Sequence, residues 1–185
     1  MLQIVRLLTQ ADFAQPHQYS KSIDNLFINK YEDFMSVDFR DAIESDLVQL
    51  IQMLASDQLG QSREDASLPI NKAYFSAFQA IQVDPNNRLI VATEGDVVIG
   101  TLQLTFIPGL ARLGSWRGQI EAVRVHENYR SQKIGESLFL WAIDECQKKG
   151  CSLVQLTTDK SRKDAHRFYD RLGFEVTHEG YKLKL

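Results

Sequence analysis

"VRVHENYRSQKIGESLFLWAIDECQKKG", residues 123–150, is the stretch that decides the fold. It begins with apolar residues in alternation, which predicts a strand. A polar turn follows, and from Ile134 to Lys149 apolar residues recur at the spacing of a helix. Lys148 and Lys149 in the last turn, with Gly150 directly after it, are typical of a helix C-terminus. The stretch therefore predicts a strand that turns sharply into a helix.

The turn between the two elements, residues 130–135, is a candidate anion site. A helix that begins directly after a strand aims its first unpaired N–H groups beyond the strand end, and the helix dipole adds positive charge there. Arg130, Gln132 and Lys133 supply further donors, and Gly135 allows a ligand to approach the backbone closely. An ordinary solvated turn remains the alternative on these residues alone.

Helix and strand patterns continue along residues 37–185. Strands are expected at 37–40, 115–125 and 152–158, in a hairpin over 88–107 that turns at 94–96, and as two closing strands in 173–185. Helices are expected at 45–57, 70–81, 134–149 and 163–172. Helices interspersed with a mixed sheet predict an α/β or α+β fold built in layers.

Residues 1–36 are interpreted as an N-terminal extension to a domain at 37–185. Its sequence predicts an amphipathic helix, which would dock on the domain or on a second subunit; a role in substrate binding is the alternative. Its apolar stripe, after Ser22 as N-cap, consists of Ile23, Leu26, Phe27, Tyr31 and Phe34.

Composition narrows the classes of function. The 185 residues carry a formal net charge of −3, which argues against nucleic acid as a general partner because phosphate binding needs a basic surface. We expect no membrane segment, because no apolar run is long enough to span a bilayer. Cys146 and Cys151 are expected to be buried thiols without a bridge, which favours a cytoplasmic location.

Two motifs carry a resemblance to a known family. Residues 123–135 resemble the acetyl-CoA motif of the GNAT superfamily of N-acyltransferases, Arg/Gln-x-x-Gly-x-Gly/Ala, and "AHRFYDRLGF" (165–174) is similar to its Ala-x-x-x-Tyr-x-x-x-Gly-Phe segment. The resemblance covers roughly residues 37–185. It implies a GNAT fold, with a mixed, mostly antiparallel central sheet and helices on both faces.

The chain departs from the motif at a few positions. Lys133 stands at the motif's first glycine, and Ser131 stands where glycine is common. A right-handed turn at 133 would cost little, whereas a positive φ would strain the lysine by roughly 1 kcal/mol or more. Arg162 replaces an asparagine that contacts the pantetheine arm in many relatives.

The resemblance implies acetyl-CoA as co-substrate. The amides of residues 131–136 would hold its pyrophosphate, and the backbone of Val123 to Val125 would pair with its pantetheine like an added strand. The predicted cofactor-binding residues are Val123, Arg124, Val125, Arg130, Ser131, Gln132, Lys133, Ile134, Gly135, Glu136 and Arg162.

The implied reaction is direct transfer of the acetyl group from the thioester to a primary amine. Tyr169 aligns with the tyrosine that protonates the leaving thiolate in the family. A phenol of pKa about 10 is still protonated at a pH where a thiol of pKa about 8.5 begins to lose its proton, so the hydroxyl is available as an acid. A core aromatic is the alternative. Glu121 is the candidate base, expected on the face of Val123 and Val125 among apolar residues. It could instead pair with an arginine or bind the substrate ammonium.

The acceptor is expected to be a small-molecule or protein amine, with Phe106 and Trp116 as candidate pocket residues. No metal is expected, because the histidines share no ligand spacing. A homodimer is compatible with the sequence. The alternatives to an enzyme are a non-catalytic acyl-CoA-binding module and an interaction protein that works through its N-terminal helix.

Overall fold

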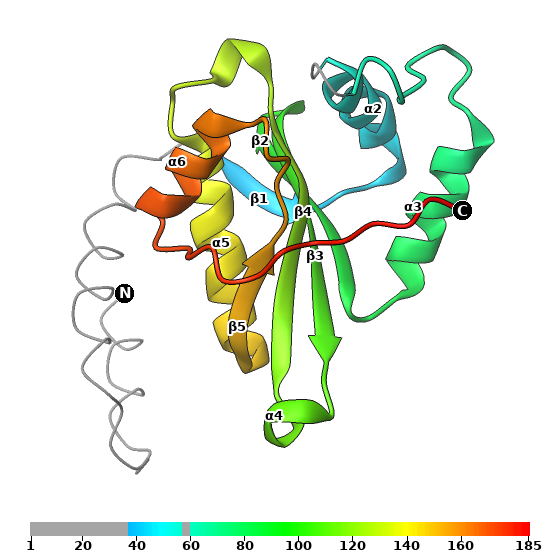
Figure 1. The fold of residues 1–185 in the computed structure, drawn as a ribbon. Coiled ribbons are helices and arrows are strands. Elements are labelled where there is room, and N and C mark those ends of the chain that lie inside the picture. Colours follow the sequence, from blue (N-terminus) through cyan, green and yellow to red (C-terminus); the bar gives the residue numbers. More distant parts are fainter. Residues whose placement is uncertain (1–36, 57–59) are drawn as a thin grey trace, which may run out of the picture. The chain divides into compact units, whose positions relative to one another are not determined.

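The computed structural model describes residues 37–56 and 60–185 (Figure 1). The helix predicted within residues 1–36 lies outside the described residues. Five strands form one sheet in the order β1-β2-β3-β4-β5. Their bounds are β1 Asp38–Asp41, β2 Asn87–Glu94, β3 Val97–Pro108, β4 Trp116–Val125 and β5 Cys151–Leu156.

The helices alternate with these strands as the sequence predicts. The four main helices are α2 Leu47–Ala55, α3 Lys72–Val83, α5 Ile134–Lys149 and α6 Lys163–Arg171, and the shorter turns are η1 Glu44–Asp46, α4 Ala111–Gly114 and η2 Glu127–Tyr129. The first four strands pair antiparallel, and β4 pairs parallel with β5. The predicted mixed, mostly antiparallel sheet is therefore confirmed.

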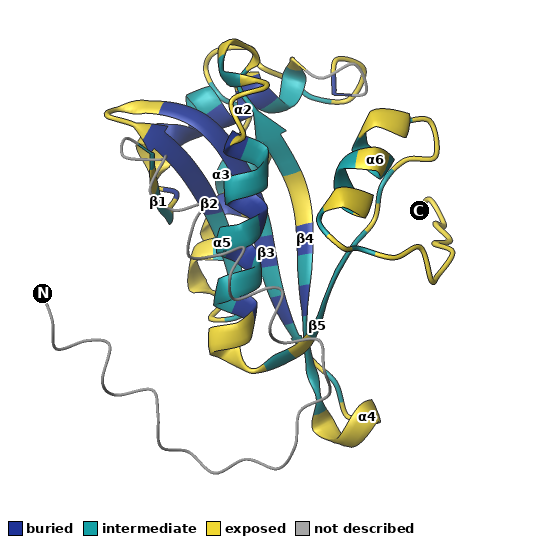
Figure 2. Ribbon diagram, turned by 90° about the vertical axis from the view of Figure 1, so that its left-hand side faces the viewer, coloured by how far each residue is buried: buried dark blue, intermediate teal, exposed yellow. Residues whose placement is uncertain are grey.

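Helices cover both faces of the sheet (Figures 1 and 2). On one face α5 packs so closely on β3 that a Cβ at Gly100 would lie 3.0 Å from Leu138 and 3.2 Å from Ile134. On the other face α2 and α3 close a second core. Its buried members are Ala42, Leu47, Leu50, Ile51, Met53, Phe78, Val91 and Val98.

A partly buried ion pair, between Arg40 and the buried Asp46, fixes the start of α2. The Asp46 carboxylate accepts hydrogen bonds from both terminal nitrogens of Arg40, at 2.6 and 3.0 Å, and from the Ile43 N–H at 2.8 Å. Burial alone would raise the pKa of Asp46, but the hydrogen bonds from Arg40 and Ile43 outweigh it and hold that pKa below its usual value. This pair joins β1 to α2.

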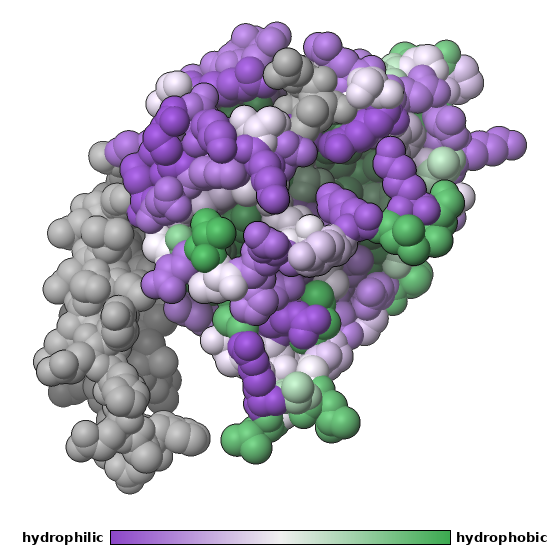
Figure 3. Space-filling model, viewed as in Figure 1, coloured by the Kyte–Doolittle hydropathy of each residue, from purple (hydrophilic) through white to green (hydrophobic). Residues whose placement is uncertain are grey.

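The C-terminal segment differs from the prediction of two closing strands. Residues 175–185 form neither helix nor strand, and their apolar side chains Val176, Tyr181, Leu183 and Leu185 are exposed. Alternation of apolar and polar residues is compatible with a strand. A strand also needs the edge of a neighbouring strand to pair with, and the alternation does not provide one. Hydrophobic side chains also gather at the tip over α4 (Figure 3), where Leu110 and Leu113 are exposed.

Gly118 on β4 lies directly under α5. A Cβ at this position would lie 2.2 Å from the Cys146 Sγ, whereas the Cys146 Cβ would be 3.5 Å away. We expect Gly118→Ala to lower the free energy of unfolding by about 2 kcal/mol through overpacking. In the background of Cys146→Ala the same substitution should cost far less, because the clashing sulfur is gone. Urea unfolding of the four proteins measures this coupling, and additive effects would contradict the packing described.

Candidate active site

The strand-to-helix turn lies at the carboxyl end of β4. After Val125 the His126 N–H donates to the Ile99 carbonyl at 2.9 Å, and the chain then passes through η2 to α5. The Gln132 side-chain amide donates to the Asn128 carbonyl at 3.0 Å, which ties the turn to η2. The start of the sixteen-residue α5 therefore presents its first N–H groups, with the positive end of its dipole, just beyond β4.

The turn is built on two left-handed residues that are not glycine. Ser131 has φ 63° and Lys133 has φ 62°. Lys133 therefore has the positive φ and not the right-handed alternative. For a residue with a side chain, this conformation costs on the order of 1 kcal/mol. Gly135 meets only ordinary contacts, since an added Cβ would lie 3.6 Å from Val125 and 3.8 Å from Phe168.

The strain at this turn can be relieved by glycine. We expect Lys133→Gly to raise the free energy of unfolding by about 0.5–1 kcal/mol, because relief of the left-handed strain exceeds the entropic cost of glycine. Ser131→Gly should act in the same direction. Gln132→Gly is the matched control, since Gln132 has no positive φ, and should destabilise. Chemical denaturation compares the three variants, and destabilisation by all of them would refute the left-handed geometry.

Strands β4 and β5 part in front of this turn (Figure 2). Their last paired residues are Ile120 and Leu156, and β4 runs on to Val125. Val123 to Val125 thus have β3 on one side and, within residues 37–56 and 60–185, no strand on the other. This free edge is the place where the sequence analysis expects the pantetheine backbone to pair.

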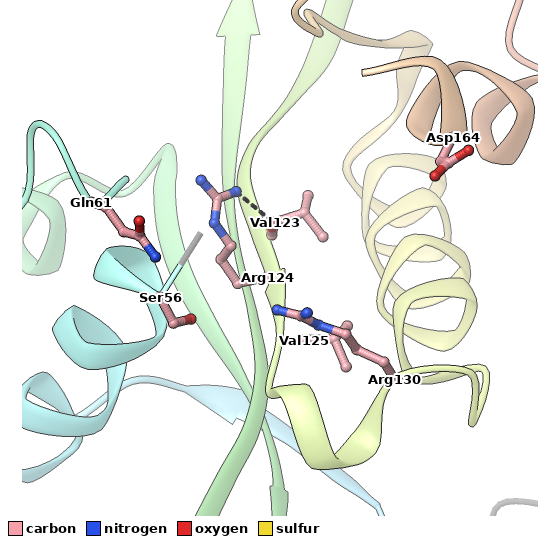
Figure 4. Close-up of a pocket in the computed structure, with 7 residues that line it drawn as sticks. All are labelled: Ser56, Gln61, Val123, Arg124, Val125, Arg130 and Asp164. Atoms are coloured by element: carbon pink, nitrogen blue, oxygen red, sulfur yellow. Dashed lines mark hydrogen bonds between the residues drawn. The ribbon is translucent and has the colours of Figure 1, made fainter. Parts of the chain in front are cut away.

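An open cavity of about 650 Å³ lies along this edge. Its lining combines the β4 end and Arg130 with side chains from the segment after α2 and the start of α6: Ser56, Gln61, Val123, Arg124, Val125, Arg130 and Asp164 (Figure 4). Within it, the Arg124 guanidinium donates to the Val123 carbonyl at 2.7 Å. Ser56, Gln61 and Asp164 were missed by the sequence analysis, because polar residues at helix ends carry no local signal of what they face.

A β-bulge in β4 changes where Glu121 lies. Glu121 pairs with Gln103, and Arg124 pairs with Thr101, so the residues between them oppose Leu102 alone. Ala122 takes a φ of 51° at this point. The expectation that Glu121 shares a face with Val125 among apolar residues is therefore wrong. Glu121 is exposed and shares the face of Arg124.

Tyr169 lies on α6, the helix beside the diverging ends of β4 and β5 (Figure 2). Its ring packs in an aromatic cluster, with ring centroids 5.6 Å from Phe139, 5.6 Å from Phe168 and 6.2 Å from Phe174. Burial raises the pKa of Tyr169, and this outweighs the lowering by the Arg162 charge, the Thr158 hydroxyl and the Arg124 charge. The ring is thus a packed aromatic, as the alternative reading expects, while its hydroxyl lies within the influence of two guanidinium groups.

Phe106 and Trp116 lie away from this cavity. Both rings are covered by the Lys149 ammonium, at 5.4 and 5.0 Å from their centroids, beside the C-terminus of α5. Trp116 begins β4 and Val125 ends it, about 30 Å apart along an extended strand. The expectation that they line the amine pocket is not met, because the β3–β4 connection joins the opposite end of the sheet.

Glu136 and Arg162 complete the predicted cofactor set. Glu136 lies half-buried in the first turn of α5, and Arg162 is the half-buried N-cap of α6. Arg162 thus precedes the first turn of α6, from which Asp164 lines the cavity.

Neither cysteine offers a nucleophile to this cavity. Burial raises the pKa of Cys146 to about 12, so its thiol stays protonated at neutral pH. In the described ranges 37–56 and 60–185, no three histidine, cysteine or acidic side chains are grouped closely enough to hold a metal ion. No helix in those ranges has the length and apolar character needed to cross a membrane.

Comparison with known proteins identifies relatives of this chain. The model of the acetyltransferase (GNAT) family matches residues 50–174. An aminoalkylphosphonate N-acetyltransferase of Salmonella typhimurium is 36% identical over 107 residues, which cover 58% of this chain and 69% of that protein. A crystal structure described as a transcriptional regulator from Bacillus halodurans C-125 is 50% identical, with a TM-score of 0.79, and covers 80% of this chain and 99% of its own.

The fold alone extends to more distant structures. Glucosamine-6-phosphate N-acetyltransferase from Arabidopsis thaliana superposes with a TM-score of 0.66 at 20% identity, over 80% of this chain and 98% of that one.

Proposed function

The chain belongs to the acetyltransferase (GNAT) family and is an acetyl-CoA-dependent N-acetyltransferase, and we propose that its cavity transfers the acetyl group directly to the primary amine of a small molecule. The observation that carries this proposal is the convergence at one edge of the sheet. The start of α5 follows the β4 edge beyond its last pairing with β5, and the Tyr169 hydroxyl is near enough for the charges of Arg162 and Arg124 to act on its pKa.

The cofactor is proposed to bind through the backbone of this edge. Acetyl-CoA supplies the activated thioester. The N–H groups at the start of α5 suit its pyrophosphate, and Arg130 and Lys133 add positive charge there. In the part of the chain that the structure describes, the edge of β4 from Val123 to Val125 has no strand neighbour on the β5 side and so suits the amide groups of the pantetheine.

Proton movements in the proposed reaction fall to Glu121 and Tyr169. The exposed Glu121 carboxylate, or water beside it, takes the proton that the acceptor ammonium must lose before it attacks. The new C–N bond forms as the C–S bond breaks, and the departing thiolate takes the phenolic proton of Tyr169. Arg162 and Arg124 favour the negative charge that develops there.

A small-molecule acceptor is supported by the relative that acts on aminoalkylphosphonates. A homodimer, which is compatible with the sequence, stays a prediction. We also propose a cytoplasmic location, on the ground that Cys146 and Cys151 are free thiols.

A second candidate function is a non-catalytic acyl-CoA-binding protein. One observation favours it, the 50% identity to a structure described as a transcriptional regulator. Such a protein would bind acetyl-CoA in calorimetry and would release no thiol from it with any amine. Release of CoA thiol that depends on an added amine therefore separates the two functions.

Tyr169→Phe tests the catalytic assignment. The ring remains and keeps its contacts with Phe139 and Phe174, so we expect unchanged thermal stability and unchanged acetyl-CoA affinity. Loss of the general acid should lower kcat by about 100-fold. Thiol release measures kcat, and calorimetry measures affinity. Wild-type turnover in the variant would show that Tyr169 only packs and is not the general acid.

The pH profile gives an independent test of the same proton. A general acid must be protonated, and burial raises the pKa of Tyr169 above its ordinary value of about 10. Deprotonation of Tyr169 should therefore not lower the activity until the pH exceeds about 10. We expect kcat at saturating substrates to stay level between about pH 8 and pH 9.5. A fall in that window that is absent from Tyr169→Phe would show that the phenol titrates too early.

A further inference from the structure

The strained turn before α5 is attached to a distant part of the sheet through Tyr129. This residue ends η2 and lies two positions before Ser131, the first left-handed residue of the turn. Its hydroxyl donates a hydrogen bond to the Glu94 Oε2 at 2.8 Å, although the two residues are 35 apart in the sequence. The bond therefore joins the end of β2 to the turn that is proposed to receive the cofactor pyrophosphate.

Glu94 is held by the body of the fold. It is the last residue of β2 and pairs with Val97 across the hairpin turn. The next residue, Val98, is buried, and its N–H donates to the Gln49 Oε1 of α2 at 2.9 Å. The end of the hairpin is thus fixed by β2, β3 and α2 together. The Glu94 carboxylate is therefore a firm anchor for a less regular segment.

The short helix η2 transmits this anchor to the turn. The Tyr129 N–H donates to the His126 carbonyl at 2.9 Å, and the two rings pack edge to face with their centroids 5.9 Å apart. The Asn128 N–H donates to the His126 Nδ1 at 3.3 Å, and the Asn128 carbonyl accepts the bond from Gln132. A displacement of Tyr129 would therefore shift residues 130–133 as well.

The turn needs an anchor because its backbone is strained. Ser131 and Lys133 hold positive φ values, and strain of this kind persists only where surrounding contacts determine the conformation. Arg130, directly after Tyr129, lines the same cavity as Val125 (Figure 4). The positions of the Arg130 charge and of the first N–H groups of α5 thus depend on where η2 lies. Donors aimed at a ligand must be held to within about 0.5 Å to be effective.

We propose that Tyr129 and Glu94 are positioning residues for acetyl-CoA, whose hydrogen bond holds the turn in the geometry that receives the pyrophosphate before the cofactor binds. The inference rests on the proposed placement of the pyrophosphate at the start of α5. Neither side chain contacts the cofactor or takes part in the acetyl transfer in this proposal. The bond acts through preorganisation, because a turn that is already ordered loses less conformational entropy on binding.

Tyr129→Phe removes the hydroxyl and keeps the ring against His126, so it tests the bond alone. We expect calorimetry to show the dissociation constant of free CoA raised by about fivefold, as the loss of one exposed hydrogen bond implies. With an amine that the wild type acetylates, saturating acetyl-CoA should restore kcat to within about twofold. S-acetylpantetheine has no pyrophosphate, so kcat/KM for this donor should change by less than about twofold.

Tyr74→Phe is the matched control. Tyr74 also donates its hydroxyl to a glutamate, Glu64, at 3.0 Å, but it lies on α3 and not in the turn. This variant should bind CoA as the wild type does. In the Tyr129→Phe background, Glu94→Gln should not weaken CoA binding further, because the bond is already lost. Thermal unfolding of each variant checks that the fold is intact.

The possible failures can be told apart. Wild-type CoA affinity in Tyr129→Phe overturns the inference and leaves the proposed function standing. An equal loss with S-acetylpantetheine also overturns it, because the effect would then not lie at the pyrophosphate. If Tyr129→Phe weakens CoA binding while no amine releases thiol with the wild type, the positioning role stands and the proposed acetyl transfer fails. Absence of CoA binding by the wild type overturns both.

Discussion

Strand β4 pairs with β3 from Trp116 to Val125, apart from the bulge at Ala122, but with β5 only as far as Ile120, and this unequal pairing organises the rest of the site. A parallel pair needs a crossover, and α5 supplies it, so the helix begins where β4 ends. Strand β5 runs in the same direction, so the chain leaves β5 for α6 at the same edge of the sheet. One topological requirement thus brings a helix N-terminus, an unpaired strand edge and Tyr169 together.

The turn before α5 has a strained backbone at two residues that carry side chains, and one of these, Lys133, is positively charged. Ser131 and Lys133 hold left-handed backbone that glycine would adopt at no steric cost. The turn is held in place from both sides, because Ile134 is buried under the sheet and the Ser137 N–H donates to the Lys133 carbonyl at 3.0 Å. A lysine here adds a positive charge at the start of the helix, which glycine cannot do.

Much of the fold could be predicted from the sequence because local patterns were strong. The α5 bounds, Ile134 to Lys149 with Gly150 as cap, follow from periodicity and end chemistry, and Gly150 has the expected positive φ of 81°. The predictions failed where long-range pairing decides the outcome. The bulge at Ala122 moved Glu121 to another face, and the residues after Phe174 found no strand partner. The prediction that Phe106 and Trp116 line the amine pocket was wrong because the sequence does not show at which end of the sheet a connecting loop lies. Ser56 and Gln61 enter the cavity only through tertiary packing.

The extra residue in β4 also separates two tasks within a single strand. Its main chain faces the gap beside β5, while the side chains of Glu121 and Arg124 face α2. Main-chain contacts depend little on the identity of the side chains, so the edge beside β5 can stay the same whatever residues stand at positions 121 and 124. The backbone edge and the side-chain face of one strand can therefore vary independently within a constant fold.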